Sequence, residues 1–395
     1  MPPAAKRRFM RPTSLENTLP RPDDASLARS RALSARIREA IAGAGGWIGF
    51  ERYVELALYE PGLGYYSADG EKIGPAGDFV TAPELSDALA RALAAAFAKW
   101  LESRPSPTIL ELGAGRGTLA AQCLDALEAL GLGDVRYLIL ETSATLRQRQ
   151  RETLAARAGR VEWLDRLPEA PFDGLIVANE VADALPFECF VKREDGAVPL
   201  GVRAAGDGFE WAEGARDPAL ADAVAHIEAA IGAPLPAGYR SELRLVLPAW
   251  IDALAGCLAQ GAIILVDYGY TRRDYYRPER DGGTLMCHYR HRAHGDPFLY
   301  PGLTDITAWV DFSACAEAGA AAGLSVAGFT TQAQFLLEAL GDALVGERER
   351  GSAAMLAALK TLLLPGEMGE RFKVFLLTKG ADGLALPGRD FRSRL

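Results

Sequence analysis

Cysteine is scarce in this chain of 395 residues, and its distribution argues against both a disulfide-linked protein and a cysteine-ligated metal protein. The five cysteines are widely spaced, and none belongs to a CxxC pair. Isolated thiols in odd number favour neither a disulfide framework nor a thiolate metal site. We therefore expect a protein of a reducing compartment: the cytoplasm, or the mitochondrial matrix if the chain is eukaryotic.

Long apolar runs are missing as well. Residues 1–23 are basic and rich in proline, but they lack the apolar segment that a secretory signal requires. We interpret them as a flexible tail, and a mitochondrial presequence is the alternative. No later segment has the length and apolar character of a membrane span.

Positive charge is also in deficit, since 43 lysines and arginines face 52 acidic residues, which gives a net charge of −9. This balance argues against nucleic acid as the main partner. About half of the residues are apolar and a quarter are charged, as in ordinary soluble globular proteins. The length permits one elaborated domain or two to three smaller ones.

Short apolar runs alternate with helical patterns through the middle of the chain. The runs TILEL, VRYLILE, VEWL and FDGLIVANE are separated by segments with apolar residues at helical spacing. This alternation predicts a parallel sheet covered by helices on both faces, which is a doubly wound α/β fold of the Rossmann-like type.

These patterns divide the chain into four parts: a tail (1–23), an N-terminal helical extension (24–104), the α/β domain (105–380) and a C-terminal tail (381–395). Two insertions are expected inside the α/β domain. The one at 185–240 has short alternating runs typical of antiparallel strands, and the one at 271–308 is polar, aromatic and suited to a lid or substrate contact.

The stretch ILELGAGRGT, residues 109–118, predicts a ligand loop between a strand and a helix. A dinucleotide fingerprint would place a third glycine at position 118, where this chain has threonine, and no lysine follows as in a phosphate-binding loop. Close backbone approach at Gly113, Gly115 and Gly117, with Glu111 in the preceding strand, suits S-adenosylmethionine best among nucleotide-type ligands.

Glu141 ends the next strand, 28 residues after Gly113. At this place a carboxylate can accept hydrogen bonds from both hydroxyls of a ribose. A cap for the helix that follows is the alternative, and the two roles are compatible. Strand, glycines, helix, strand and terminal glutamate together predict a nucleoside site.

Motifs spread along the chain resemble the MidA family of S-adenosylmethionine-dependent methyltransferases. The resemblance covers about residues 30 to 380 and implies a class I methyltransferase sheet. Mitochondrial members of that family act as arginine methyltransferases in the assembly of respiratory complex I. The motifs are LGYYS (63–67), GDFVTAPELS (77–86), ELGAGRGT (111–118), ANEVADALP (178–186), VDYGY (266–270), GTLMCHYRHRAHGDP (283–297) and PGLTDITAWVDF (301–312).

The acceptor is expected at the carboxyl ends of the strands, where ligands bind in open α/β sheets. Asn179, Glu180 and Asp183 lie in the motif VANEVADALP at the end of the fourth strand, and we predict that they bind the acceptor and carry the catalytic chemistry. A satisfied turn or a helix start is the alternative for the first two.

Three further residues are candidates for the cofactor site. Arg116 either pairs with the methionine carboxylate of the cofactor or braces a nearby acidic residue. The resemblance implies that Thr81 and Pro83 line the same site, whereas a capping box formed by Thr81 and Glu84 explains the same letters.

The spacing of His288, His291 and His294 matches no metal-ligand signature, so no metal site is predicted. We expect His291 and His294 to contact the substrate at the rim of a lid.

Three functions remain. The resemblance implies methylation of an arginine in a partner protein, a subunit of respiratory complex I being the implied partner. An assembly factor or chaperone that binds S-adenosylmethionine without essential turnover is the alternative. An NAD-dependent oxidoreductase is disfavoured by Thr118.

Overall fold

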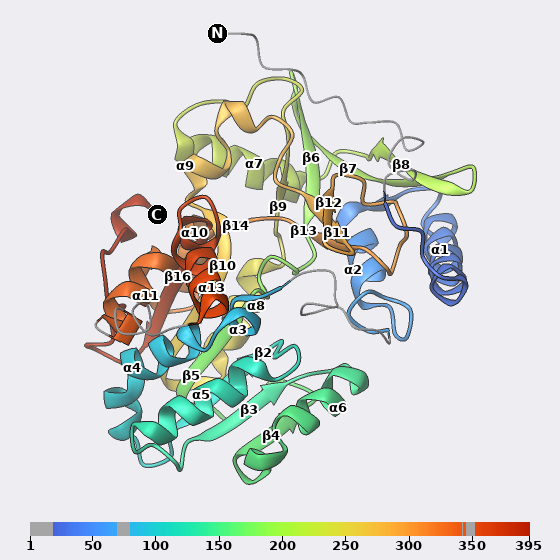
Figure 1. The fold of residues 1–395 in the computed structure, drawn as a ribbon. Coiled ribbons are helices and arrows are strands. Elements are labelled where there is room, and N and C mark those ends of the chain that lie inside the picture. Colours follow the sequence, from blue (N-terminus) through green and yellow to red (C-terminus); the bar gives the residue numbers. More distant parts are fainter. Residues whose placement is uncertain (1–18, 69–79, 342, 345–351) are drawn as a thin grey trace.

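The computed structural model describes residues 19–68, 80–341, 343–344 and 352–395 (Figure 1). Residues 1–18 of the predicted tail and residues 77–79 of the GDFVTAPELS motif lie outside these ranges.

A twisted, mostly parallel sheet forms the centre of the molecule, with the strand order β15-β16-β10-β5-β2-β3-β4. Only β16 among these strands runs antiparallel to its neighbours, and β14 extends the pairing at the end of β10. The predicted doubly wound fold is confirmed. The strands are β2 (Thr108–Leu112), β3 (Arg136–Leu140), β4 (Val161–Leu164), β5 (Phe172–Asn179), β10 (Leu258–Tyr270), β14 (Val310–Asp311), β15 (Ser325–Thr331) and β16 (Phe372–Lys379).

Helices cover both faces of this sheet, because successive strand residues point to opposite sides. Ile109 packs under α4, α5 and α11, whereas its neighbour Leu110 packs under α8 and α10. The helices are α3 (Ala82–Leu85), α4 (Ala88–Glu102), α5 (Thr118–Ala129), α6 (Ala144–Thr153), α8 (Leu247–Gly256), α10 (Phe312–Ala321), α11 (Gln332–Leu340), α13 (Ala353–Leu363) and α14 (Met368–Arg371).

The insertion at 185–240 forms antiparallel strands, as its alternation predicts, and they continue into a second sheet in the order β1-β7-β6-β9, with β8 on β7. Helices α1 and α2 pack on this second sheet (Figure 1). The predicted helical extension is therefore divided, because its helix α4 packs on the central sheet instead. The elements are α1 (Asp24–Gly43), β1 (Ile48–Gly49), α2 (Phe50–Tyr59), β6 (Glu188–Arg193), β7 (Gly196–Ala205), β8 (Gly208–Glu213), α7 (Pro218–Ile231) and β9 (Arg240–Leu243).

The insertion at 271–308 is a packed unit despite its weak periodicity. It contains a small antiparallel sheet in the order β12-β11-β13, and Cys287 and Ile306 of this sheet are fully buried beside α2. Its elements are α9 (Arg272–Tyr275), a 3-10 turn (Pro278–Arg280), β11 (Met286–Tyr289), β12 (Arg292–His294) and β13 (Asp305–Thr307).

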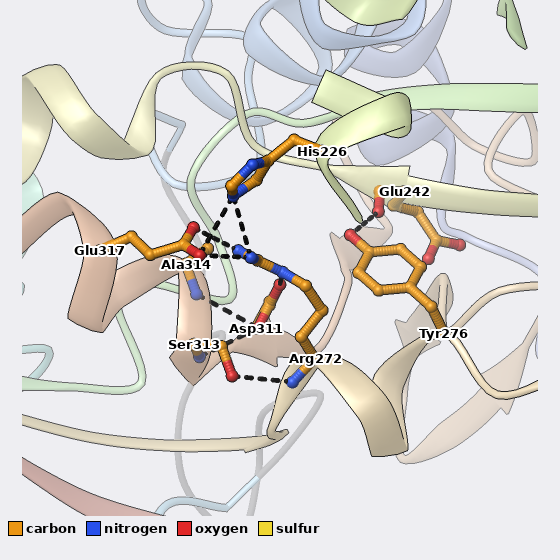
Figure 2. A network of polar contacts seen from close by, with 8 residues as sticks. All are labelled: His226, Glu242, Arg272, Tyr276, Asp311, Ser313, Ala314 and Glu317. Carbon is orange, nitrogen blue, oxygen red and sulfur yellow. Dashed lines mark hydrogen bonds and ion pairs between the residues drawn. The ribbon is translucent and has the colours of Figure 1, made fainter. Parts of the chain in front are cut away.

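An ion-pair network centred on buried Arg272 fixes the start of this insertion to the central domain (Figure 2). Arg272 donates to Asp311 at 3.1 Å and to both oxygens of Glu317 on α10, while His226 of α7 lies 3.2 Å from the same guanidinium. Asp311 also caps α10 through the backbone N–H groups of residues 313 and 314. The network therefore holds α7, α9 and α10 together next to the end of β10.

The C-terminal segment, the cysteines and the helices each add one observation. The C-terminal segment 381–395 lies along β15, where the Phe391 N–H donates to the Phe329 carbonyl at 2.7 Å. Each of the five cysteines, all within the described ranges, is buried and free. Searching the described helices finds none with the length and apolar character needed to cross a membrane.

Candidate functional site

The loop between β2 and α5 turns through the left-handed region at each of its glycines. The φ angles of Gly113, Gly115 and Gly117 are +61°, +54° and +84°. Side chains rarely adopt such angles, so the three glycines allow this tight backbone path. A Cβ atom at Gly113 would also lie 3.1 Å from a methyl group of Val181, which shows how closely the segment after β5 approaches the loop.

Glu141 lies beside this loop and is tied to it by Gln150. Its carboxylate accepts the Ser143 N–H at 2.8 Å and the Gln150 side-chain amide at 3.0 Å, and the same amide donates to the Gly115 carbonyl at 3.0 Å. Burial raises the pKa of Glu141, while these donors oppose the shift. A carboxylate has about four acceptor positions, so capacity for further donors remains.

Gln150 was not predicted from the sequence. It is fully buried on α6, and its oxygen accepts the indole N–H of Trp163 at 3.0 Å. The sequence did not indicate its role, because α6 consists mostly of polar residues and nothing distinguishes Gln150 from the exposed ones. The cap of α6 is Ser143, which accepts from the Leu146 N–H, so Glu141 supports the turn before that helix.

Helix α3 lies against the glycine loop from the other side. The Thr118 hydroxyl donates to Glu84 at 2.5 Å, and the Gln122 side chain donates to the Pro83 carbonyl at 3.0 Å. The capping box is therefore wrong, because Glu84 bonds to α5 and, within the described residues, the Thr81 side chain caps no N–H of α3. These contacts place Thr81 and Pro83 next to the loop.

Glu111 and Arg116 occupy different surroundings. Glu111 is 2% exposed and accepts the Tyr137 hydroxyl at 2.8 Å, and burial raises its pKa to about 7. It thus lies in the core beneath the loop. Arg116 is half-buried within the loop itself, between two of the glycines.

Glu180 follows β5 in a strained conformation. Its φ angle of +53° is uncommon outside glycine and costs about 1–3 kcal/mol, and its N–H bonds to the Val266 carbonyl at 2.9 Å. Burial, and then the charge of Asp183, raise the pKa of Glu180 to about 8. The Asn179 amide at 3.3 Å and the Ala82 N–H oppose this shift, so α3 reaches the acceptor side as well.

Asp183 is 5% exposed and has one satisfied and one unsatisfied oxygen. Tyr268 donates its hydroxyl to Oδ2, and the Asp183 N–H donates to buried Asp267 at 3.1 Å. Within the described part of the chain, Asp183 Oδ1 and Asn179 Oδ1 are buried without hydrogen-bond partners. Burial raises the pKa of Asp183. Two buried acceptors at the end of β5 are therefore without a donor among the described residues.

The insertion and the N-terminal extension add residues that sequence reasoning missed. Asp305 of β13 is buried and accepts the Tyr66 hydroxyl at 3.0 Å, and its charge contributes to the raised pKa of Glu180. Tyr66 stacks on Tyr59 with ring centroids 5.6 Å apart, and Tyr59 donates to the Ala184 carbonyl at 2.8 Å. Both Asp305 and Tyr66 lie in motifs that resemble the MidA family, and this resemblance was the one sequence signal that pointed to them.

Negative charge is in excess at this site. After burial, the charges of Asp183 and Asp305 help to raise the pKa of Glu180, and those of Asp183 and Glu180 help to raise the pKa of Asp267. Arg244 is near, but its N–H groups donate to the main-chain carbonyls of residues 183, 308 and 309 at 2.6, 2.5 and 2.8 Å. The arrangement is suited to a cationic group with several donors.

The predicted histidines lie elsewhere. His294 is buried on β12, two strands from β13, and burial lowers its pKa to about 4. His291 is exposed at the β11–β12 turn, next to Arg290, which approaches Asp23 at 3.8 Å. The structure thus does not bring these histidines together with Glu180. Among the described residues, no group of three histidine, cysteine or acidic side chains is arranged to hold a metal ion.

Comparison with known proteins adds the following similarities. The model of a family described as S-adenosyl-L-methionine-dependent methyltransferases matches residues 88–330. Mouse protein arginine methyltransferase NDUFAF7, mitochondrial, is 28% identical over 384 residues, covering 84% of this chain and 81% of that protein. The human protein of the same name is 26% identical over 382 residues, covering 84% and 80%.

A crystal structure of a superfamily relative from Burkholderia thailandensis, bound to S-adenosyl-homocysteine, is similar over nearly its whole length. Its sequence is 44% identical, the TM-score is 0.86, and the match covers 94% of this chain and 99% of that one. A native structure from the same organism gives a TM-score of 0.84 with the same identity and coverage.

Proposed function

Since this chain belongs to the S-adenosyl-L-methionine-dependent methyltransferases, we propose that it transfers the cofactor's methyl group to an arginine side chain of a partner protein. The observation that carries the acceptor assignment is the surplus of carboxyl groups near the end of β5, where Asp183 Oδ1 and Asn179 Oδ1 lack donors among the described residues. A guanidinium supplies five donors and a charge of the required sign. The names of the mitochondrial relatives support the same acceptor.

The glycine loop and Glu141 fit the cofactor. The left-handed glycines leave three positions of the loop without side chains that would block a ligand, and Glu141 retains acceptor capacity for ribose hydroxyls. Thr81 and Pro83 of the adjoining segment would complete the wall, and Arg116 would bind the carboxylate of the cofactor. Glu111 would act from beneath by supporting β2 and the start of the loop.

The bound cofactor supplies an electrophilic methyl group on a sulfonium, so the protein needs no nucleophile of its own. Positioning and charge are the tasks left to the chain. Glu180 would grip the guanidinium, localise its positive charge on the nitrogen that does not react, and take the proton that the methylated nitrogen releases. Its raised pKa, about 8, suits a group that accepts a proton near neutral pH.

Asp183 and Asn179 would orient the same guanidinium through their unsatisfied oxygens. Tyr268 holds Asp183 by donating to its other oxygen, and Asp305 with Tyr66 closes the site from the insertion side. In this arrangement Asp183 and Asn179 would accept hydrogen bonds from the planar cation, and the tyrosines would orient the carboxylates. A neutral amide acceptor would leave the excess charge uncompensated.

The partner is proposed to be a protein, and a subunit of respiratory complex I is the one that the family resemblance implies. We place the enzyme in the cytoplasm, or in the mitochondrial matrix of a eukaryote. Five buried free cysteines support a reducing compartment.

Labelled methyl transfer tests this proposal. Purified enzyme is incubated with labelled S-adenosylmethionine and a protein extract from a strain that lacks the gene, and the labelled peptides are mapped. Methylarginine in a protein is the expected product. Label on lysine, glutamine or a small molecule would refute the acceptor, and cofactor binding without any transfer would favour the assembly-factor alternative.

A further inference from the structure

A second polar pocket lies at the N-terminal end of α2, away from the tip of β5. It encloses about 480 Å³, within the range of about 300–1,000 Å³ that small-ligand sites occupy. Residues of helix α2 and of strands β6 and β7 of the second sheet line it. The side chains that give it chemical character are Trp47, Glu51, Arg52, Glu55, Glu188 and Asp217.

The charges of this pocket are not balanced. Arg52 is engaged with Glu55 at 2.6 Å, and within the described part of the chain no lysine or arginine forms an ion pair with Glu51, Glu188 or Asp217. The carboxyl groups of Glu51 and Glu188 contact each other, and one oxygen of Glu188 is buried without a hydrogen-bond partner. Burial and then Glu51 raise the pKa of Glu188 to about 7. A cation entering here would relieve this repulsion.

Trp47 gives the pocket a rigid aromatic wall. Its indole N–H donates to the Ala212 carbonyl at 2.9 Å. The ring lies directly over two glycines, since a Cβ atom at either Gly201 or Gly214 would come within 2.4 Å of it. A fixed indole beside carboxylates is the combination that arginine uses, because guanidinium both stacks on aromatic faces and pairs with carboxylates.

One face of α2 connects this pocket to the acceptor site. Glu51, Glu55 and Tyr59 follow one another at intervals of four, so they share a face of the helix. Tyr59 is 37% exposed, and its hydroxyl bonds to Ala184 next to Asp183. The helix rises about 12 Å from Glu51 to Tyr59. An extended peptide covers that length with about four residues.

We infer that this pocket binds a second arginine of the acceptor protein, about four residues away from the arginine that is methylated. The inference rests on the proposed function, because it takes Glu180 and its neighbours as the site of the first arginine. The pocket binds the guanidinium of an extended or unfolded segment of the acceptor protein. This segment lies along the face of α2 that carries Glu51, Glu55 and Tyr59.

Three terminally blocked glycine peptides test the inference: one with two arginines four positions apart, and two in which glutamine replaces one arginine or the other. Calorimetry in the presence of S-adenosyl-homocysteine, at about 20 mM salt to limit screening, gives their affinities. We expect the two-arginine peptide to bind about tenfold more tightly. In the double variant Glu55→Gln, Asp217→Asn this advantage should disappear, while the affinity of the one-arginine peptides stays the same.

The two substitutions are chosen to preserve the fold. Glu55 is exposed, and asparagine at 217 keeps the oxygen that caps α7 by accepting from the Ala219 N–H. The double variant Glu102→Gln, Glu169→Gln is the control, because it changes the net charge equally at exposed positions of the central domain. This control should retain the full tenfold advantage.

The outcomes separate this inference from the proposed function. A tenfold advantage that persists in the Glu55, Asp217 variant, or that is absent in the wild type, overturns the second arginine site. The proposed function stands in that case if Glu180→Gln still abolishes binding of the one-arginine peptides. Failure of the wild type to bind any of the peptides at millimolar concentration contradicts both.

Discussion

Gln150 donates its side-chain amide to the carboxylate of Glu141 at 3.0 Å. The two residues are nine positions apart and come from α6 and the end of β3, so this bond fixes where the carboxylate points relative to the central sheet. Because the same amide holds the Gly115 carbonyl, the glycine loop and the proposed ribose-binding carboxylate are positioned by one side chain.

Glu141→Ala should weaken the binding of S-adenosylmethionine or S-adenosyl-homocysteine by about 1.5–3 kcal/mol, the scale of charge-assisted hydrogen bonds. Calorimetry measures the change. Glu152→Ala, on the exposed side of α6, is the matched control and should bind normally. Equal affinities of wild type and Glu141→Ala would remove this residue from the ribose site.

Gly115→Val should abolish cofactor binding, because a β-branched side chain would stand in the ligand's path at a φ angle of +54°. Gly131→Val separates this effect from backbone strain: Gly131 has a φ angle of +83° in open surroundings, so the strain is similar and the loop is untouched. A folded Gly115→Val protein that binds the cofactor like the Gly131→Val protein would show that the loop is misassigned.

The kcat/KM for the acceptor should rise with pH and level off above about pH 8, because Glu180 must be ionised to grip a guanidinium and accept its proton. In the complex the bound cation favours the ionised form, so the corresponding rise in kcat should lie at lower pH. Initial rates across the pH range give both profiles. A flat kcat/KM between about pH 6 and 9 would contradict the role of Glu180.

Glu180→Gln should also change how stability depends on pH. The pKa of Glu180 is raised from 4.5 to about 8 by folding, so the folded state binds more protons between these values and loses stability as the pH rises through them. The variant lacks this loss, and because each pH unit between the two pKa values is worth about 1.4 kcal/mol, it should be more stable than the wild type by about 4–5 kcal/mol near pH 9, with little difference near pH 4.5. Urea unfolding at the two pH values measures it. Equal free energies of unfolding near pH 9 would argue that the carboxyl is not held in a charge-excluding site.

Tyr66→Phe should raise the KM for the acceptor about three- to tenfold, since it removes one hydrogen bond that orients Asp305. The cofactor affinity should not change, because the Tyr66 hydroxyl bonds to Asp305 of the insertion. Steady-state kinetics with varied acceptor separate the two parameters. An effect confined to the cofactor KM would place Tyr66 on the other side of the site.

The fold was predictable where local pattern and burial agree. The alternation of Ile109 and Leu110 across the sheet is encoded by a run of apolar residues, and the antiparallel strands of 185–240 are visible as short alternating segments. The glycine loop was predictable because three glycines at alternate positions directly follow an apolar strand, and the structure gives each glycine a left-handed φ angle.

The tertiary part of the site was not predictable in the same way. Gln150 contacts the loop only because α6 folds back on β3, and Asp305 reaches Glu180 only because β13 packs beside α2. The histidines of the same insertion drew attention by their chemistry, yet their strand lies on the far side of β11. Thr81 and Glu84 satisfied a local capping pattern, but a tertiary bond to Thr118 replaced it.

Methyl transfer by Glu180→Gln tests the central claim most directly. Wild type and variant are given the same labelled cofactor and the same extract from a strain lacking the gene, and methylarginine is measured after hydrolysis of the proteins. The variant should bind the cofactor with unchanged affinity and form about 10²–10⁴ times less methylarginine, the range that positioned acid–base catalysis contributes. Methylarginine formation at the wild-type rate in Glu180→Gln would contradict the account.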